Sequence, residues 1–223
     1  MSGEITLDDF GRMMAGAAEA IRENHTVLSE LDCIAGDGDH GATMLRAVEC
    51  LQQTFSSSGP DSLKAALKQA GWGVLGVDGG ASSSLLGVFI GGMANSPGCD
   101  APVGTNELAA IFEAGLTAIS KQTKAQPGDK TMMDALVPAV TALRNAGTAG
   151  KTVVDAMRDA AAAARLGAEA TRDLTARQGR ARLLGERTRG HMDPGAASMS
   201  LLFEGFYRGL RAQKGDAGNY AKD

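Results

Sequence analysis

The feature that most constrains this chain is a helical repeat of apolar residues that recurs along almost its whole length. In the first such segment, from Thr6 to Asn24, apolar side chains recur every three or four residues, which places them on one face of a helix. These side chains are Phe10, Met13, Met14, Ala17 and Ile21. No run that alternates apolar and polar residues is long enough to require a β-sheet. The sequence therefore predicts an all-α bundle of about seven or eight helices.

Local signals indicate where these helices begin and end. Thr6 and Asp9 form a capping-box pattern at the start of the first helix. The helical spacing returns before the SSSGP break and again over residues 61–75, 106–121, 134–146, 151–170 and 198–210. Thr105 or Asn106 is a suitable N-cap for the helix at 106–121. Pro138 indicates that the helix at 134–146 either begins late or is kinked.

Residues 71–94 are apolar enough, over a sufficient length, to resemble a membrane span. Asp78 and the serines Ser82, Ser83 and Ser84 argue against one, because a carboxylate inside a bilayer is costly. We expect instead a buried glycine-rich turn that leads into a central helix, and no membrane partner.

Composition limits the functional classes. The 223 residues suit one domain, which we place at 1–211, followed by a polar tail at 212–223. A net charge of −4 disfavours a nucleic-acid partner. The three cysteines form no C-x-x-C pair, so neither a disulfide framework nor a zinc site is expected. The segment MSGEITLDDF has neither the basic nor the apolar region of a secretion signal, which favours a cytoplasmic protein.

The densest chemical signal is the segment LDCIAGDGDHG, which begins at Leu31. It offers three carboxylates, Asp32, Asp37 and Asp39, with His40 beside them. Oxygen ligands crowded in this way suit Mg²⁺, with phosphate oxygens or waters in the remaining positions. An EF-hand does not fit, because the twelfth residue from Asp32 is Thr43 rather than glutamate. The alternative is an ordinary cluster of turns and helix caps, since Asp and Gly dominate turns.

Two glycine-containing segments could approach phosphate. Gly79-Gly80-Ala81-Ser82 precedes a helix candidate, whose N-terminus would favour an anion, although a Gly-Gly pair also permits close helix packing. The segment GDKT at 128–131 is not a Walker A motif, because Asp129 stands between the glycine and the lysine and no strand precedes it. Thr131 could cap the next helix, contact a nucleotide, or do both.

The segment QGRARLLGERTRGHMDPG, at 178–195, is rich in arginine. Its guanidinium groups could bind phosphate through paired hydrogen bonds; they belong to Arg180, Arg182, Arg187 and Arg189. Asp193 and Pro194 are suitable as the N-cap and first residue of a helix. A solvated basic loop is the alternative, and RNA binding a weaker one. Of the other histidines, His25 is expected at the surface, and His191 could be structural or functional.

Taken together, these motifs resemble the nucleotide-binding (L) subunit of dihydroxyacetone kinases over nearly the whole chain. The matching segments occur in the family's order: Leu31–Gly41, Gly79–Ser82, Pro127–Met132, Gly179–Arg187 and Gly190–Ala196. The resemblance implies an eight-helix antiparallel barrel with the nucleotide at one end, in agreement with the helical spacing. One departure is Ser83-Ser84, where family members often have Gly-Pro, and this bears on the shape of the phosphate loop.

The resemblance also implies site residues. Asp32, Asp37 and Asp39 would bind two Mg²⁺ ions that bridge the phosphates of ADP or ATP. The nucleotide contacts would come from His40, Gly41, Ala42, Thr43, Ala81, Ser82, Met132, Arg180, Asp193, Pro194 and Gly195. Thr123 stands where the family has a small residue near the base.

Family kinases hold the sugar on a separate K subunit or domain, for which this chain has no room. The resemblance therefore implies half of an enzyme, active only when a K subunit presents the ketose. The phosphoryl donor would be ATP or a phosphohistidine protein of the sugar phosphotransferase system. The alternatives are a regulatory nucleotide-binding module that transfers nothing, or a subunit that serves a related tetrose ketose.

Overall fold

The computed structural model describes residues 4–56, 60–99 and 102–212, and helices dominate this part of the chain. The α-helices are α1 (Leu7–Asp32), α2 (His40–Ser56), α3 (Leu63–Leu75), α4 (Gly80–Met93), α5 (Thr105–Ser120), α6 (Met133–Thr148), α7 (Val153–Ala170) and α8 (Pro194–Arg211). Short 3₁₀ segments are η1 (Pro97–Cys99), η2 (Thr171–Asp173) and η3 (Arg180–Thr188). Extended pairing within the described residues is limited to a single antiparallel bridge between Ile5 and Val103. The all-α prediction is confirmed.

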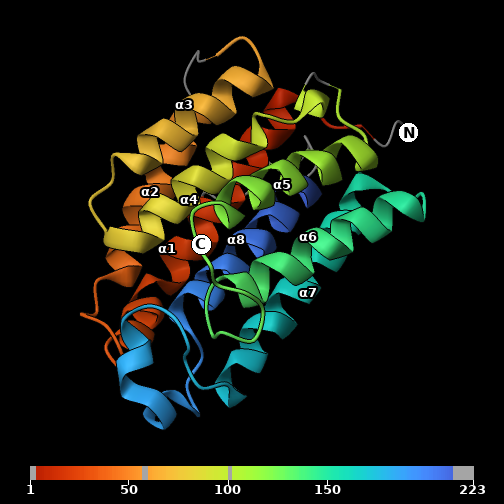
Figure 1. Cartoon of the computed structure of the whole chain (residues 1–223). Helices are drawn as coiled ribbons and strands as arrows, with labels where there is room; N and C mark the ends of the chain where they lie inside the picture. Colours follow the sequence, from red (N-terminus) through yellow and green to blue (C-terminus); the bar gives the residue numbers. More distant parts are fainter. Residues whose placement is uncertain (1–3, 57–59, 100–101, 213–223) are drawn as a thin grey trace, which may run out of the picture.

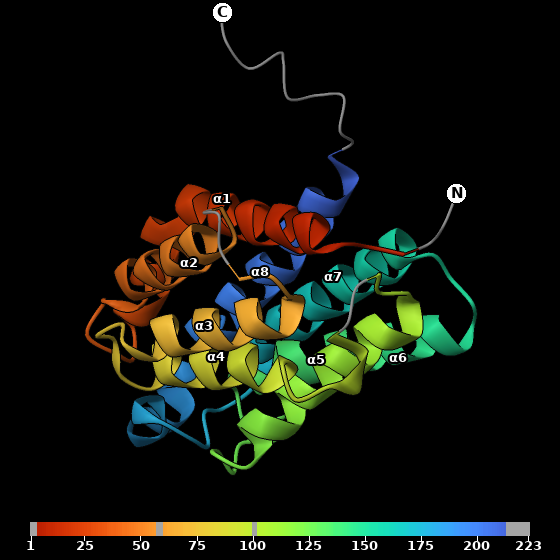
Figure 2. The same cartoon turned by 90° about the horizontal axis from the view of Figure 1, so that it is seen from above.

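The helices form a closed antiparallel ring. Each helix packs against the next one along the chain, and α8 returns to pack against both α7 and α1 (Figures 1 and 2). Because successive helices run in opposite directions, α2, α4, α6 and α8 all begin at the lower end of the view in Figure 1. The loops that join α1 to α2, α3 to α4, α5 to α6 and α7 to α8 gather there.

Aromatic rings fill the interior between α4, α5 and α8. The ring of Phe112 lies 6.0 Å from that of Phe89, 5.5 Å from that of Phe203 and 5.9 Å from that of Phe206, measured between centroids. All four side chains are essentially inaccessible to solvent. Such rings stabilise a core through apolar burial and edge-to-face contact. The apolar residues that recur along the sequence therefore form the inner faces of the helices and the core of the barrel.

Helix boundaries agree with the sequence in most places and differ at several. The Thr6–Asp9 capping box is present. The N-cap of α5 is Gly104 rather than Thr105 or Asn106, and the Thr105 hydroxyl donates instead to the Lys151 carbonyl at 2.8 Å. The turn before α4 is not buried, since its residues are exposed or half-exposed at the lower end of the barrel. The helix predicted to begin at 198 starts at Pro194, with Asp193 as its N-cap, as the Asp-Pro pair suggested.

Pro138 lies inside α6, so the helix does not begin late. Proline has no N–H to donate to the carbonyl four residues earlier, which here belongs to Asp134. That carbonyl instead faces Gly167 of α7, where a Cβ atom would come within 2.0 Å of it. A glycine at 167 thus lets α7 approach the part of α6 that proline leaves unpaired.

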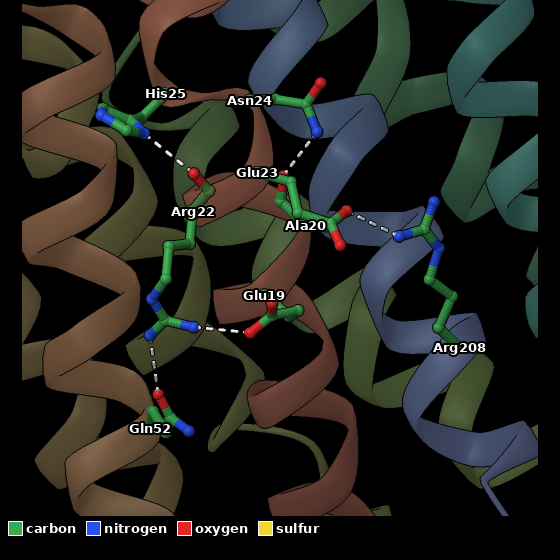
Figure 3. Close-up of polar contacts among 8 residues, drawn as sticks. All are labelled: Glu19, Ala20, Arg22, Glu23, Asn24, His25, Gln52 and Arg208. Carbon is green, nitrogen blue, oxygen red and sulfur yellow. Dashed lines mark hydrogen bonds and ion pairs between the residues drawn. The ribbon is translucent and has the colours of Figure 1, made fainter. Parts of the chain in front are cut away.

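The outer face of α1 carries polar links to both of its neighbours (Figure 3). Arg22 bonds to Glu19 at 2.7 Å and to Gln52 of α2 at 3.4 Å, and Arg208 of α8 pairs with Glu23 at 3.0 Å. His25 is half-buried on this face, with Nδ1 2.8 Å from the Arg22 carbonyl. Exposed pairs of this kind contribute little stability, about 0–1 kcal/mol each. His25 is therefore part of a surface network, as expected.

None of the described helices is both long enough and apolar enough to cross a membrane. The proposed tail at 212–223 lies outside the described residues except for Ala212.

Candidate nucleotide and metal site

The lower end of the barrel combines two kinds of helix terminus. Helix α1 ends at Asp32, and C-termini carry partial negative charge that favours cations. Helices α2, α4 and α8 begin at the same end, and the partial positive charge of helix N-termini favours anions. A metal ion bound to a phosphate group suits this end of the barrel, because the cation is favoured by the end of α1 and the anion by the starts of the other helices.

The three aspartates predicted as metal ligands lie together. Asp32 is 8% exposed, and its Oδ2 accepts a hydrogen bond from the Gly38 N–H at 2.9 Å. Asp37 and Asp39 are exposed. One carboxylate oxygen from each of the three lies within 4.8 Å of the others. A Cβ atom at Gly36 would come within 2.1 Å of the Asp32 carboxylate, so a larger residue here would displace that carboxylate.

Negative charge at this cluster is only partly compensated. Arg180 of η3 forms a hydrogen-bonded ion pair with Asp37, which lowers the pKa of that carboxyl to about 2. The pKa of Asp39 is raised, first by partial burial, then by its hydrogen bond to Asp37 and by the charges of Asp37 and Asp32. A divalent cation would relieve this repulsion, and clustered carboxylate oxygens are the donors that Mg²⁺ prefers. The residues present therefore fit Mg²⁺.

His40 opens α2 and joins three helices. Its ring is 5% exposed, with Nδ1 3.1 Å from the Ser82 hydroxyl of α4 and Nε2 3.0 Å from the Ser198 hydroxyl of α8. Burial lowers the pKa of His40. Both ring nitrogens are thus engaged inside the protein, so the ring serves to hold the starts of α2, α4 and α8 together.

The Gly79-Gly80 turn packs directly onto α2. A Cβ atom at Gly79 would meet the Thr43 side chain at 2.1 Å, and Gly80 has a left-handed φ of 64°. Arg46 of α2 bonds to the Asp78 carbonyl at 2.7 Å and thereby holds the turn. The Gly-Gly pair therefore permits close packing, and α4 begins without a side-chain cap, which leaves its first N–H groups available to an anion.

The two serines that depart from the family pattern face the turn itself. Ser83 is buried and its hydroxyl donates to the Val77 carbonyl at 3.0 Å. Ser84 is exposed and its hydroxyl donates to the Gly80 carbonyl at 2.9 Å. These bonds stabilise the turn, and they leave Ser82 as the serine of this segment that faces His40.

The segment 127–134 folds around a buried carboxylate. Asp134 is 7% exposed and accepts from the Gly128 N–H at 2.6 Å and the Thr131 N–H at 2.8 Å. The N-cap of α6 is Met132 rather than Thr131, and the Thr131 hydroxyl accepts from the Met133 N–H at 3.2 Å from one position before the cap. Asp134 was missed because the sequence shows it only as one more helical residue.

Lys130 points inward rather than toward a phosphate. It has a left-handed φ of 61°, is 5% exposed, and donates from Nζ to the carbonyls of Thr171 and His191 at 2.5 Å each. Burial lowers its pKa. This lysine ties the segment 127–134 to the residues that lead into α8, which no local sequence pattern indicates.

The start of α8 lies against these segments. The Asp193 carboxylate caps the helix by accepting from the Ala196 N–H at 2.8 Å, and burial raises its pKa to about 7 despite the nearby charge of Lys130. A Cβ atom at Gly195 would come within 3.4 Å of Met132. A small cleft joins this region to the aspartate loop, and its lining includes Ile34, Asp193 and Pro194.

The chain's sequence matches the DAK2 domain over residues 34–208. This chain belongs to the DAK2 domain family. One curated relative of the DAK2 chain is the ADP-binding subunit DhaL of the PEP-dependent dihydroxyacetone kinase 1 of Listeria innocua, which is 38% identical over 88% of this chain and 90% of its own length. The corresponding subunit of Escherichia coli is 35% identical over 79% of this chain and 84% of its own length.

A solved structure shares the fold of this DAK2 chain. The dihydroxyacetone kinase of C. freundii, crystallised with AMP-PNP and Mg²⁺, superposes with a TM-score of 0.68 at 23% identity. The match covers 89% of the DAK2 chain and 33% of the C. freundii chain, so this chain corresponds to about a third of that protein.

The structure brings together most of the residues predicted for the DAK2 site. The aspartates meet Arg180, His40 meets Ser82, and Met132 adjoins Gly195. Gly41 and Thr43 are buried in the first turn of α2, whereas Ala42 and Ala81 are exposed at the starts of α2 and α4.

Other predicted residues are less tightly tied to the site. Thr123 is half-buried in the loop after α5, where its hydroxyl accepts from the Ala125 N–H at 3.1 Å. Of the four arginines at 180–189, Arg180 reaches the aspartates, whereas Arg189 pairs with Glu186 at 3.4 Å. His191 is exposed, and its carbonyl is what Lys130 binds.

A wider hollow on the described surface lies away from these residues. It has a volume of about 400 Å³ between α3 and α4, and its lining includes Trp72, Leu75, Val88 and Gly91. The charged side chain that borders it is Lys68. Since this hollow lacks the acidic and helix-terminal groups described above, the charged lower end of the barrel remains the candidate site.

Proposed function

We propose that this chain is the nucleotide-binding subunit of a two-component dihydroxyacetone kinase. It holds ADP or ATP with Mg²⁺, and it transfers a phosphoryl group to dihydroxyacetone bound on a separate sugar-binding subunit. The observation that carries the proposal is the cluster of Asp32, Asp37 and Asp39 beside the N-termini of α2, α4 and α8, of which α4 has no side-chain cap. The names of the two relatives support it, since both are ADP-binding subunits of dihydroxyacetone kinases.

Asp32, Asp37 and Asp39 would hold Mg²⁺, which supplies charge neutralisation for the phosphates when bound. We propose two ions, because three carboxylates with several oxygens each can share more than one. Arg180 pairs with Asp37, and its guanidinium would also bind a phosphate group of the nucleotide. The exposed amides at the start of α4 would bind phosphate oxygens. Met132 and Gly195, which pack together, would border the adenosine.

The ketose that accepts the phosphoryl group must reach the lower end of the barrel, where the three aspartates lie. Phosphoryl transfer depends on positioning and charge stabilisation, so a bound ketose has to lie in line with the transferred group. The sugar-binding subunit is therefore proposed to dock over the end that carries Asp37, Ser82 and Asp193. As the donor we propose a phosphohistidine protein of the phosphotransferase system that recharges bound ADP, because relatives are named PEP-dependent or PTS-dependent. Such a system is cytoplasmic, as we propose for this chain, whose single domain would span 1–211.

A tetrose ketose is the second candidate substrate. A relative from Mycolicibacterium smegmatis named L-erythrulose 1-kinase is 37% identical over 82% of this chain, which covers 32% of that longer protein. The sugar would be selected by the sugar-binding subunit, so the two substrates do not differ in what they require of this chain.

Reconstitution tests the proposal. The purified chain with dihydroxyacetone and either ATP or a phosphorylated donor protein is expected to give negligible product, because nothing holds the ketose in line. Addition of the cognate sugar-binding subunit should raise turnover by orders of magnitude. The Asp37→Asn variant should fail in the same mixture, whereas Asp61→Asn, at the opposite end of the barrel, should support turnover. Robust phosphorylation by the isolated chain, or none with the partner and both donors, would contradict the proposal.

A further inference from the structure

A chain of hydrogen bonds runs from the first turn of α8 to Ser82 through His40. The Ser198 hydroxyl donates to the Gly195 carbonyl at 3.0 Å, and its oxygen lies 3.0 Å from Nε2 of His40. Nδ1 of His40 lies 3.1 Å from the Ser82 hydroxyl. Ser198 is 2% exposed and His40 is 5% exposed, so both side chains are shielded from bulk solvent.

The direction of each hydrogen bond in this series, from Ser198 through His40 to Ser82, can be assigned. A neutral imidazole has one N–H donor and one acceptor nitrogen. The single Ser198 proton is engaged with the Gly195 carbonyl, so the Ser198 oxygen accepts from Nε2 of His40. Nε2 must therefore carry the proton. The reverse tautomer would take the Ser198 proton away from Gly195.

With Nε2 protonated, Nδ1 is an acceptor and the Ser82 hydroxyl must donate to it. The Ser82 proton is then turned inward, and its oxygen is presented outward with lone pairs only. Phosphate oxygens of a bound nucleotide lack protons near pH 7, so they cannot donate to it. The oxygen can receive a hydrogen bond from a metal-bound water or a nucleotide hydroxyl, and the phosphates are left to the N–H groups of α4.

We propose that Ser198 is a positioning residue that fixes the tautomer of His40 and, through it, makes Ser82 a hydrogen-bond acceptor toward the hydrated metal–nucleotide. This proposal rests on the proposed function for the identity of the ligand. The assignment of the tautomer rests on the protein alone, so the two can fail separately.

Nitrogen-15 NMR of histidine-labelled protein tests the tautomer without any ligand. The expected spectrum shows a pyrrole-type Nε2 and a pyridine-type Nδ1 for His40. A protonated Nδ1 in the wild-type protein would overturn the proposal, whatever the protein binds.

Calorimetric titration with ADP in the presence of Mg²⁺ tests the consequence for binding. Ser198→Ala is expected to weaken affinity by about threefold to tenfold, the worth of one hydrogen bond. Ser200→Ala is the matched control, because Ser200 makes the same kind of bond to a carbonyl of α8, that of Ala197 at 2.9 Å. It should bind ADP as the wild type does.

A double-mutant cycle separates positioning from general damage. If Ser198 acts through Ser82, then Ser198→Ala should cost nothing further in a Ser82→Ala background. Equal losses in both backgrounds, or equal effects of Ser198→Ala and Ser200→Ala, would overturn the positioning role. If wild-type protein binds no ADP with Mg²⁺, the proposed function fails while the NMR test still decides the tautomer.

Discussion

The interior of the barrel and its lower end are held together by different kinds of interaction. The interior is a set of rings such as Phe112 and Phe203, which need only be apolar and correctly spaced to pack. The lower end depends on directional bonds between residues far apart in sequence, such as Arg180 with Asp37 and Lys130 with Thr171. The difference teaches that stability and ligand binding should be separable by mutation, since few groups serve both.

The largest expected effect is on the interior. Phe112→Ala would remove a ring that contacts three others and should lower the free energy of unfolding by about 3–5 kcal/mol. Urea unfolding measures this loss, and ADP affinity of the folded fraction should stay within about twofold. Phe112→Leu, which keeps most of the apolar volume, should cost less. A variant that unfolds normally but loses ADP binding would break the separation.

The converse experiment changes the aspartate cluster. Asp37→Asn should leave the unfolding free energy of the free protein nearly unchanged, because exposed ion pairs contribute little. It should remove most of the stabilisation by ADP with Mg²⁺, which amounts to about 2.7 kcal/mol at a ligand concentration 100 times Kd. Asp61→Asn removes the same charge at the opposite end and should keep that stabilisation. Equal stabilisation of the two variants by ADP would show that the cluster holds no metal.

A smaller effect is expected at Arg180, where the charge is kept and the geometry is changed. Lysine cannot reproduce the paired hydrogen bonds of a guanidinium, so Arg180→Lys should weaken nucleotide binding by about tenfold. Arg172→Lys, also exposed at this end, should have no effect. Calorimetric titration compares the two variants. Indistinguishable affinities would return Arg180 to the role of a solvated basic residue.

A further effect concerns pH. Asp193 has a folded-state pKa of about 7, raised by burial from an ordinary value of 3.8. The folded protein therefore keeps this proton between about pH 4 and pH 7 while the unfolded chain loses it, so the contribution of Asp193 to stability falls as pH rises through that window. Asp193→Asn retains a capping oxygen and should flatten this slope in urea unfolding measured from pH 5 to pH 8. Parallel curves for the wild type and the variant would contradict the assignment.

The sequence predicted more of the fold than of the hydrogen bonds within the site. Phe10, Met13 and Ile21 show their burial through spacing alone, and Asp193-Pro194 shows a helix start through local chemistry. Lys130 and Ser198 could not be found in this way, because their partners are carbonyls or rings that only the closed barrel brings near. The turn at 76–79 was expected to be buried but is exposed or half-exposed. The expectation was wrong because the apolar content of a sequence does not show which end of a helix pair faces solvent.

The same limit applies to the nucleotide contacts. The adjacency of Asp32, Asp37 and Asp39 follows from a short loop, so spacing was sufficient to predict it. The packing of Met132 against Gly195 joins segments more than sixty residues apart, and the resemblance to a known family implied these two residues only as separate nucleotide contacts.

The most direct test of the account is the dependence of ADP binding on Mg²⁺. Thermal unfolding of the wild-type protein should be followed with saturating ADP, once with Mg²⁺ and once with excess chelator, together with matched samples that lack ADP. The account predicts that ADP raises the unfolding temperature only when Mg²⁺ is present, because three crowded carboxylates repel a phosphate that no cation neutralises. An equal rise in the presence of chelator would contradict it.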